Sequence, residues 1–531
     1  MSGLSKVDHA TSPPAIEISR QYNAANDLIE RNLAAGRGGK VAYVDDAGRC
    51  TFADLAVRVN RAANALTGLG LGMDDRIMLC HLDTVDWVAV FLGAIKAGIV
   101  PIAVNTLLTS SDYEFMLNDS RAKALVVSEQ LWPQFAPILG RCPHLKHVMV
   151  SGADAQGSGT RLQDLLAHAG VSFTAAPTNA DDPCFWLYSS GSTGTPKGTV
   201  HIQTSMLYTA ELYGRPVLGI RTDDVVYSAA KLFFAYGLGN ALSFPLAVGA
   251  TTVLMAERPT PAAVFKRLKE HRPTIFYGVP TLCGALLASP ELPQRSALNL
   301  RVCTSAGEAL PADIGRRWTE HFGVEILDGI GSTEMLHIFL SNRPGEVRYG
   351  TSGKAVPGYR LRVVNEQGKD AAPDEIGDLL VAGPSAAAGY WNNRERTRST
   401  FLGEWTRTGD KYTYDADGYY TYSGRSDDML KVGGIFVSPF EVEGALLSHP
   451  DVLEAAVVGI PDDAQLIKPK AYVVTKQGVQ GTPALADALK QHVKDRLAPY
   501  KYPRWVEFVP ELPKTATGKI QRFKLRQGDG A

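Results

Sequence analysis

The sequence is poor in cysteine, in net charge and in long apolar runs. Its six cysteines are widely spaced, with no Cys-x-x-Cys pair, which argues against a disulfide or zinc framework and favours reduced thiols in the cytoplasm. A formal net charge of −1 gives no electrostatic reason to expect a nucleic acid or an anionic membrane as partner. The opening residues also lack the apolar core of a signal peptide. We therefore expect a cytoplasmic globular protein.

The most apolar stretch, Trp87 to Val104, is interrupted by Lys96 and Pro101. These breaks argue against a membrane span and favour a buried helix followed by a strand. At 531 residues the chain exceeds what one hydrophobic core usually supports, so more than one domain is expected.

Short β-branched runs alternate with helical patterns, which predicts an α/β fold of parallel sheets covered on both faces. The predicted strands are Arg76–Cys80, Ile99–Val104, Ala124–Ser128, Val225–Ser228, Thr251–Met255, Thr274–Tyr277, Arg301–Thr304 and Val324–Leu327. Glycine and aromatic density between Gly377 and Tyr422 predicts a β-rich cap. We expect a large N-terminal domain, 1–424, that includes this cap, and a small mobile α+β domain, 425–531.

A glycine- and hydroxyl-rich segment runs from Tyr188 to Gly198, directly after the apolar lead-in Phe185-Trp186-Leu187. Glycines let backbone N–H groups crowd an anion, hydroxyls add donors and a lysine adds charge, so the segment predicts a polyphosphate site. It is not a Walker A loop, because its lysine is not followed by Ser or Thr. A flexible linker is the alternative. The candidate residues are Ser190, Gly191, Ser192, Thr193, Gly194 and Lys197.

Three later predicted strands run into small, polar or acidic residues, the first of them, Thr274–Tyr277, into Gly278-Val279-Pro280. In open α/β sheets, ligands bind beyond the carboxyl ends of the strands, so these turns and the glycine-rich segment predict one site. The residues are Ser305, Ala306, Gly307 and Glu308 after one strand, and Asp328, Gly329, Ile330, Gly331, Ser332, Thr333 and Glu334 after the next.

Five motifs in a fixed order together resemble the adenylate-forming superfamily of acyl-CoA synthetases, luciferases and adenylation domains. They are 188–198, 328–334, Thr406–Asp410, Gly424–Asp427 and Pro513–Lys519. Within the superfamily, segments 231–240 and 328–337 are most similar to benzoate–CoA ligases. The resemblance implies ATP, Mg²⁺ and coenzyme A, and two half-reactions in one site. A carboxylate attacks the α-phosphorus of ATP, and the CoA thiol then displaces AMP from the acyl-adenylate.

The resemblance also implies catalytic roles for three residues. Lys519 would bridge the substrate carboxylate and the α-phosphate, offsetting the repulsion between two anions; a solvated lysine is the alternative. Glu334 would contact Mg²⁺, which prefers carboxylate and phosphate oxygens, or would be an acid at a helix N-terminus. Thr333 would offer its hydroxyl to the α-phosphate, or would be an N-cap.

For the nucleoside, the resemblance implies that Asp410 accepts from the ribose hydroxyls and that Arg425 adds donors nearby. A turn aspartate and an interdomain ion pair are the respective alternatives. The two strand-end segments would offer adenine a flat backbone approach and acceptors. Many family members have an aromatic residue where this chain has Ile330, so base contact there would be aliphatic.

The acyl pocket would be walled by Ala235, Tyr236 and Gly237 on one side and by Ile330, His337 and Ile338 on the other. Such walls suit an aromatic ring. A core aromatic cluster, and a core histidine for His337, are the alternatives. Tyr236 or His337 would serve a ring hydroxyl or amine, so 4-hydroxybenzoate and 2-aminobenzoate stay open as substrates.

Rotation of the small domain about Asp427 would let one site carry out both half-reactions. It would bring Lys431, Gly433 and Gly434 to pantetheine; a hairpin turn is the alternative for the two glycines. Lys501 and Arg504 are candidates for the CoA phosphates.

The function expected is an aromatic acid–CoA ligase, with benzoate as substrate and a homodimer as a possible assembly. The alternatives are an enzyme that loads an aryl group onto a carrier protein, and a nucleotide-binding regulator that has lost catalysis. Retention of Lys519, Glu334 and Asp410 argues against the last.

Overall fold

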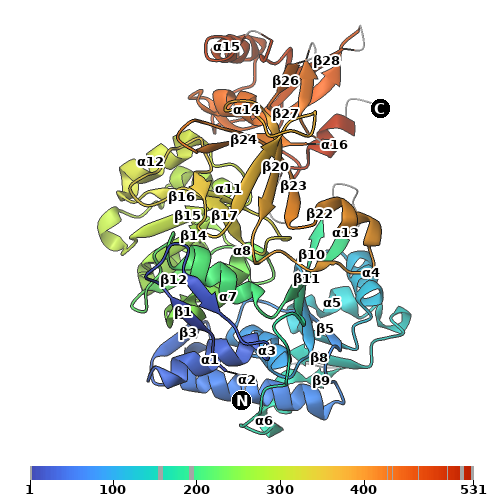
Figure 1. The fold of residues 1–531 in the computed structure, drawn as a ribbon. Helices are drawn as coiled ribbons and strands as arrows, with labels where there is room; N and C mark the ends of the chain where they lie inside the picture. The colour runs from blue at the N-terminus through green and yellow to red at the C-terminus, as the bar shows by residue number, and fades with distance from the viewer. Residues whose placement is uncertain are drawn as a thin grey trace.

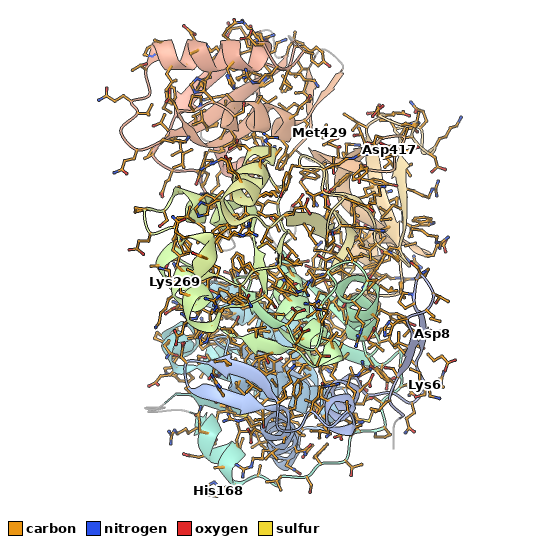
Figure 2. The ribbon with its side chains drawn as sticks, turned by 90° about the vertical axis from the view of Figure 1, so that its left-hand side faces the viewer. Lys6, Asp8, His168, Lys269, Asp417 and Met429 are labelled. Carbon is orange, nitrogen blue, oxygen red and sulfur yellow. The ribbon has the colours of Figure 1, made fainter. Side chains whose placement is uncertain are left out.

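The computed structural model describes residues 3–152, 159–190, 196–426, 428–432, 435–463, 466–498, 500–514 and 520–527. A large body holds most of the chain, and a small C-terminal domain sits at one end of it (Figure 1). Seen from the side, Met429 lies where the two parts meet and His168 lies at the far end of the large body (Figure 2). No helix in the described ranges is long and apolar enough to cross a membrane.

The first large sheet has eight strands, with a parallel centre as predicted. Its central strands are apolar and almost entirely buried, which is typical of a sheet covered on both faces. Two antiparallel strands close one edge. In spatial order the strands are β21 (Gly389–Tyr390), β11 (Pro196–Ile202), β10 (Pro183–Ser190), β6 (Val100–Ala103), β5 (Arg76–Cys80), β7 (Ala124–Ser128), β8 (His147–Ser151) and β9 (Thr160–Arg161).

The second large sheet has nine strands and is also parallel at its centre. In spatial order they are β18 (Lys354–Ala355), β17 (Ile338–Ser341), β16 (Ile326–Gly331), β15 (Val302–Ser305), β14 (Ile275–Gly278), β12 (Val225–Ser228), β13 (Thr251–Val253), β3 (Val41–Asp45) and β4 (Gly48–Thr51). Both sheets confirm the predicted α/β class.

Helices cover these two sheets. They are α1 (Ala24–Ala34), α2 (Phe52–Gly68), α3 (Val85–Lys96), α4 (Ser110–Ser120), α5 (Trp132–Phe135), α6 (Leu162–His168), α7 (Ser205–Thr209), α8 (Ala235–Leu238), α9 (Phe244–Val248), α10 (Pro261–His271), α11 (Pro280–Ala288) and α12 (Ala312–Phe322). Two π-helical turns, η3 (Ala210–Gly214) and η4 (Gly239–Ser243), interrupt them. The predicted helix–strand unit between Trp87 and Val104 is confirmed as α3 followed by β6.

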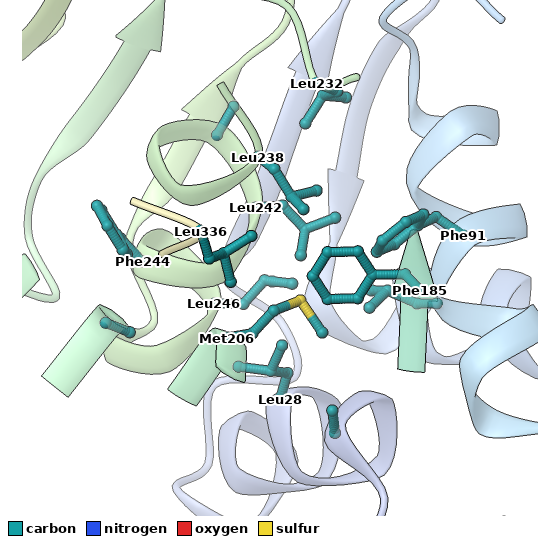
Figure 3. Close-up of a cluster of buried hydrophobic side chains, with 14 of the residues drawn as sticks. Leu28, Phe91, Phe185, Met206, Leu232, Leu238, Leu242, Phe244, Leu246 and Leu336 are labelled. Atoms are coloured by element: carbon teal, nitrogen blue, oxygen red, sulfur yellow. The ribbon is translucent and has the colours of Figure 1, made fainter. Parts of the chain in front are cut away.

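One apolar core joins the two sheets. Figure 3 shows Phe91 and Phe185, from the side of the first sheet, facing Leu238, Leu242 and a cluster of other residues from the side of the second. The rings of Phe91 and Phe185 lie 5.6 Å apart between centroids. Because these side chains are almost fully buried, the two sheets form one packed unit.

The predicted β-rich cap is confirmed as a five-stranded antiparallel sheet. Its strands are β19 (Arg360–Val364), β20 (Gly377–Ala382), β22 (Phe401–Leu402), β23 (Trp405–Tyr414) and β24 (Tyr420–Arg425), with α13 (Arg394–Thr400) beside them. A two-stranded ribbon, β1 (Lys6–Asp8) and β2 (Ala15–Glu17), precedes α1.

The small domain has its own apolar core and an α+β pattern, as predicted. It contains β25 (Leu430–Val432), β26 (Ile435–Val437), α14 (Pro439–Leu447), β27 (Val452–Pro461), β28 (Ile467–Thr475), α15 (Pro483–Lys494), β29 (Trp505–Phe508) and α16 (Arg522–Gln527). It meets the large body through Tyr422 of β24, whose ring stands edge-on to Phe440 of α14 at 4.7 Å.

Candidate active site

Three neighbouring parallel strands, β14, β15 and β16, end at the same edge of the nine-stranded sheet. In register, Gly278 pairs with Ser305 and Ser305 pairs with Asp328. The residues that follow these strands are therefore brought together, as their positions in the sequence predicted. This edge is where a planar ligand could lie against exposed backbone.

The predicted adenine segment after β15 begins with a buried residue and continues into a turn that has open space beside it. Ala306 is buried. Gly307 has φ +95° and open space where a Cβ would stand, a conformation that favours glycine. Glu308 follows on the same turn. On the adjacent strand, burial raises the pKa of Asp328 well above its usual range, and its Oδ1 has no hydrogen-bond partner.

The segment 328–331 is a strand, not the turn that the sequence suggested. β16 runs on to Gly331 and pairs antiparallel with β17, with a bulge after Ile330. A Cβ on Gly329 would stand 2.8 Å from the Leu340 carbonyl oxygen, and one on Gly331 would stand 2.5 Å from the His337 carbonyl oxygen. The glycines therefore permit close pairing, rather than ending the strand.

The turn that closes this hairpin holds Ser332, Thr333 and Glu334. No helix begins here in the described chain, because α12 ends at Phe322 and α13 starts at Arg394. The alternatives of a helix N-cap for Thr333 and a helix N-terminal acid for Glu334 are therefore wrong. The Ser332 hydroxyl accepts from the Met335 N–H at 3.2 Å, so the turn is held by its own side chain.

Glu334 lies in a charged and hydrogen-bonded group with Tyr390 and Lys197. The Tyr390 hydroxyl donates to its carboxylate at 2.7 Å, and the Lys197 ammonium lies 3.9 Å from the same oxygen. That ammonium also donates to the Tyr390 hydroxyl at 3.3 Å and stands 4.6 Å from the ring centroid. Burial lowers the pKa of Lys197, and the Glu334 carboxylate opposes this effect.

Thr333 is fixed through its backbone by a buried histidine. The Nε2–H of His201 donates to the Thr333 carbonyl oxygen at 2.8 Å. Burial lowers the pKa of His201 to about 4, so the imidazole is neutral near neutral pH. This hydrogen bond involves the Thr333 carbonyl and not its hydroxyl.

The two strands that flank the glycine-rich segment, β10 and β11, pair antiparallel. Ser190 pairs with Pro196 across it, which confirms the strand lead-in. Gly191, Ser192, Thr193 and Gly194 lie outside the described residues. Lys197, on β11, faces Glu334, so this strand pair is directly attached to the rest of the site.

The predicted acyl wall is α8 and the loop before it. The Tyr236 hydroxyl and the Thr304 Oγ1 of β15 are hydrogen-bonded at 2.5 Å, and Ala235 packs against the main core. A Cβ on Gly237 would stand 2.0 Å from the Lys231 carbonyl oxygen. Only glycine fits there, which sets how tightly the wall is folded.

His337 lies against this wall, as predicted. Its Nε2 lies 3.2 Å from the Tyr236 carbonyl oxygen and 3.1 Å from Asn240 Oδ1. Both partners are acceptors, so Nε2 carries the proton and Nδ1 is an acceptor; Nδ1 has no partner. Burial lowers the pKa of His337 to about 3.

The rings of Tyr213, Tyr236 and Phe244 surround the His337 imidazole, with centroids at 5.3, 5.5 and 4.5 Å. Ile338 is buried beside it, and Gly331 and Ile338 are paired in the hairpin. Ile330 is partly buried against the same core. The structure therefore brings the predicted acyl residues together.

Asp410 and Arg425 are cross-strand neighbours on β23 and β24. Their side chains form an ion pair at 3.0 Å, and the Arg425 guanidinium also donates to the Thr408 carbonyl oxygen at 3.2 Å. Asp410 is only 7% exposed. Gly409, directly before Asp410, adopts φ +77°, which turns β23 at that point.

In the small domain, Lys501 forms an ion pair with Glu441 at 2.6 Å, and the Arg504 guanidinium stacks 3.7 Å from the Tyr502 ring centroid. Lys431 lies on β25, and the strands on either side of Gly433 and Gly434 pair as a hairpin. Asp427, Gly433, Gly434 and Lys519 themselves lie outside the described residues.

In the described part of the chain, no group of three or more His, Cys, Asp or Glu side chains could hold a metal ion. Glu334 is a single carboxylate with a 16% exposed side chain. One carboxylate, completed by phosphate and water oxygens, is the kind of ligand set that Mg²⁺ accepts. The residues present therefore fit a magnesium–nucleotide complex and do not fit a metal held by protein ligands alone.

Sequence reasoning missed four residues of this site: Tyr390, His201, Asn240 and Thr304. The Gly-Tyr-Trp run at 389–391 and the His201 shortly after the glycine-rich segment were visible signals. Asn240 ends the segment 231–240 that carried the family resemblance, whereas Thr304, at the end of an apolar strand, gave no signal.

Two family models match the chain. One, described as AMP-binding enzyme, matches residues 30–391. The other, AMP-binding enzyme C-terminal domain, matches residues 441–519.

Individual relatives are similar over nearly the whole length. The benzoate–CoA ligase of Thauera aromatica is 64% identical over 99% of this chain and 100% of its own. A crystal structure of a benzoate CoA ligase from Burkholderia xenovorans LB400 has a TM-score of 0.89 at 54% identity, covering 95% of this chain and 100% of its own. An anthranilate CoA ligase in complex with anthranoyl-AMP has a TM-score of 0.93 at 44% identity, covering 97% of this chain and 98% of its own.

Proposed function

We propose that this chain, which belongs to the AMP-binding enzyme family, is an AMP-forming benzoate–CoA ligase. It joins benzoate, ATP and CoA into benzoyl-CoA, AMP and diphosphate through benzoyl-adenylate. The observation that carries the proposal is the 64% identity to the Thauera aromatica ligase along the full length of both chains. The acyl wall of Tyr236, Gly237 and His337 supports it.

A carboxylate is a poor electrophile, because its two oxygens share the negative charge. Adenylation removes that charge and supplies AMP as leaving group. In the first half-reaction, Lys519 offsets the repulsion between benzoate and the α-phosphate, as positioned cations do in phosphoryl-type transfer. Thr333 would donate its hydroxyl to the α-phosphate, while the hydrogen bond from His201 to its carbonyl oxygen fixes the backbone of this turn.

The nucleotide would lie along the strand ends. Ser190 to Gly194 and Lys197 would hold the phosphates, segments 305–308 and 328–332 would face adenine, and Asp410 would accept from the ribose hydroxyls. The ion pair between Asp410 and Arg425 supports this role, because it fixes the position of the carboxylate on β23.

Glu334 would hold Mg²⁺, which when bound neutralises phosphate charge. The Tyr390 hydroxyl orients the carboxylate from one side. Lys197 adds a second positive charge close to the same place. Lys197 and a Mg²⁺ ion on Glu334 would together place positive charge where a diphosphate would leave.

We further propose that the domains divide at residue 424, with 1–424 binding the two first substrates and 425–531 moving as a unit about Asp427. The separate apolar core of the small domain supports this division. Rotation would exchange Lys519 for Lys431, Gly433 and Gly434, which would receive pantetheine. Lys501 and Arg504 remain candidates for the CoA phosphates. The proposed setting is cytoplasmic, as a monomer or homodimer.

A panel of carboxylates, assayed for AMP release with and without CoA, tests the function. We expect benzoyl-CoA from benzoate and no thioester from medium-chain fatty acids. Adenylate formation without any thioester would instead identify an enzyme that loads a carrier protein. Thioester from fatty acids at an equal rate would refute the aromatic assignment.

Ring-substituted substrates are a second possibility that one observation favours. His337 presents an unpartnered acceptor, Nδ1, inside the aryl pocket region. Such an acceptor pairs with a ring hydroxyl or amine, and the anthranilate CoA ligase shares 44% identity. The same panel should therefore include 4-hydroxybenzoate and 2-aminobenzoate.

A further inference from the structure

Asp83 is a buried carboxylate that none of the motifs above includes. It follows β5 of the eight-stranded sheet and is 5% exposed. Its two oxygens accept from the Leu232 N–H at 3.2 and 3.4 Å. Leu232 follows β12 of the nine-stranded sheet and lies at the edge of the shared core (Figure 3). Asp83 therefore ties one sheet to the segment that leads into the acyl wall.

Lys231, next to Leu232, is held just as firmly. Its ammonium donates to the carbonyl oxygens of Met255, Ala256 and Glu257. Its charge acts on Asp83, where it opposes the effect of burial. A buried carboxylate needs compensation for its lost solvation, and Asp83 has the Leu232 N–H as a donor and the charge of Lys231 acting on it.

The segment from Lys231 to the acyl wall transmits any displacement. The Phe234 N–H donates to the Lys231 carbonyl oxygen at 3.0 Å. The contact between Gly237 and the same carbonyl leaves no room for a Cβ. A shift of Lys231 and Leu232 would therefore move Tyr236 and Gly237 with it.

We propose that Asp83 is a positioning residue for aryl-acid binding, which holds the 231–237 segment through its hydrogen bond from the Leu232 N–H. The proposal rests on the aryl acid–CoA ligase function above. It predicts that Asp83 controls the apparent affinity for the aryl acid and leaves that for ATP alone.

The charge of Asp83 gives a pH signature. Burial raises its pKa to about 6, while Lys231 and the Leu232 N–H oppose this rise. Above that pH it is ionised and attracts Lys231; below it the protonated carboxyl loses that attraction. The other charged groups around this pair are Arg267, Glu257 and Asp46, which act on Lys231. On its own segment the neighbours are His81 and Asp86.

Two variants of the full-length enzyme separate the charge from the hydrogen bond. Asp83→Asn keeps an acceptor for Leu232 and loses the charge, whereas Asp83→Leu loses both. We expect the KM for benzoate to rise about threefold or more in Asp83→Asn and about tenfold or more in Asp83→Leu, the scale of a lost hydrogen bond to a charged group. The KM for ATP should change less than about twofold on the same scale.

Asp224→Asn is the matched control. Asp224 is equally buried and ion-paired, with Arg301, but it precedes β12 at the opposite end of the strand. Its loss should lower stability without selective change in the KM for benzoate. Equal changes in the KM for benzoate and ATP in the Asp83 variants, or none in either, would overturn the proposal.

The pH dependence of KM is a second test of the role of Asp83. Because it can be measured on the wild type, it tests the role even if a variant does not fold. In the wild type the KM for benzoate should rise as pH falls below about 6, with the KM for ATP unchanged. In Asp83→Asn this rise should be absent. A flat wild-type profile would refute the role of the charge. These measurements use whichever acid of the carboxylate panel has the highest kcat/KM. If benzoate is not a substrate, the proposed function is refuted, but the role of Asp83 can still be tested with another acid.

Discussion

The acyl wall and the small domain are held in opposite ways. The wall is part of the core that joins both large sheets, and Tyr236 is bonded to Thr304 while Asn240 is bonded to His337. The small domain has a core of its own. It meets the large body at an edge-on contact between Tyr422 and Phe440.

This difference matches two different demands. Recognition of a flat ring needs walls whose positions do not change, since small displacements remove contacts. Two half-reactions in one site need a part that changes position. A domain with its own core can move without exposing the core of its neighbour.

Of the changes predicted here, loss of Lys519 should have the largest effect on the reaction rate. It would also distinguish most clearly the role of the small domain from that of the acyl wall. We expect Lys519→Ala to lower the adenylation rate by about 10²-fold or more, the scale of a lost electrostatic stabiliser. Thioester formation from supplied benzoyl-adenylate should be largely kept. Both half-reactions are measured by rapid quench.

Lys514→Ala is the control for this experiment. Lys514 lies in the same motif but pairs with Glu454 inside the small domain at 2.7 Å. Its replacement should leave both half-reactions near the wild-type rate. An equal fall of both half-reactions in Lys519→Ala would contradict the division of roles.

Alanine at a glycine should act oppositely in the two regions. At Gly237 the added Cβ would collide with the Lys231 carbonyl oxygen, so Gly237→Ala should destabilise the enzyme by about 1–3 kcal/mol and weaken benzoate binding. At Gly444, inside α14, a Cβ has open space. Gly444→Ala should therefore stabilise by up to about 1 kcal/mol. Urea unfolding and the KM for benzoate measure the pair, and similar shifts at both sites would contradict the steric argument.

The smallest effect concerns acid stability. Burial holds the pKa of His337 at about 3 and that of His201 at about 4, below the value near 6.5 of an unfolded histidine. The unfolded state then binds more protons, so stability should fall as pH drops below about 6.5, by about 1 kcal/mol per pH unit for each histidine.

His337→Gln, which cannot be protonated, should show a shallower decline than the wild type. The exposed His168 provides the control, and His168→Gln should retain the wild-type slope. Thermal unfolding between about pH 7 and pH 5 covers the relevant range. If stability fell with pH at the same rate in the wild type and in His337→Gln, His337 would not contribute to the loss of stability in acid.

The sequence predicted the strands best where apolar, β-branched runs are buried on both faces. β5, β7 and β12 begin and end where expected. β16 was the instructive failure, since its Asp-Gly-Ile-Gly end has the composition of a turn. Pairing with β17 overrides that local preference, because the glycines let the two backbones approach.

Motif residues could be recognised from the sequence, whereas the residues that orient them could not. Tyr390 reaches Glu334 over 56 positions, Asn240 reaches His337 over 97 and Asp83 reaches Leu232 over 149. The sequence near each of these residues does not indicate which distant residue it contacts. Only the fold brings such distant positions into contact.

The core that joins the two large sheets also limits how this protein could be divided. Phe91 and Phe185 would lose their packing against Leu238 and Leu242 if the two sheets were separated, so each half would expose apolar surface and aggregate. A cut at the single loop after β24 avoids that cost. Recombination of this catalyst with its homologues should therefore succeed when whole small domains are exchanged, and fail when the large body is split.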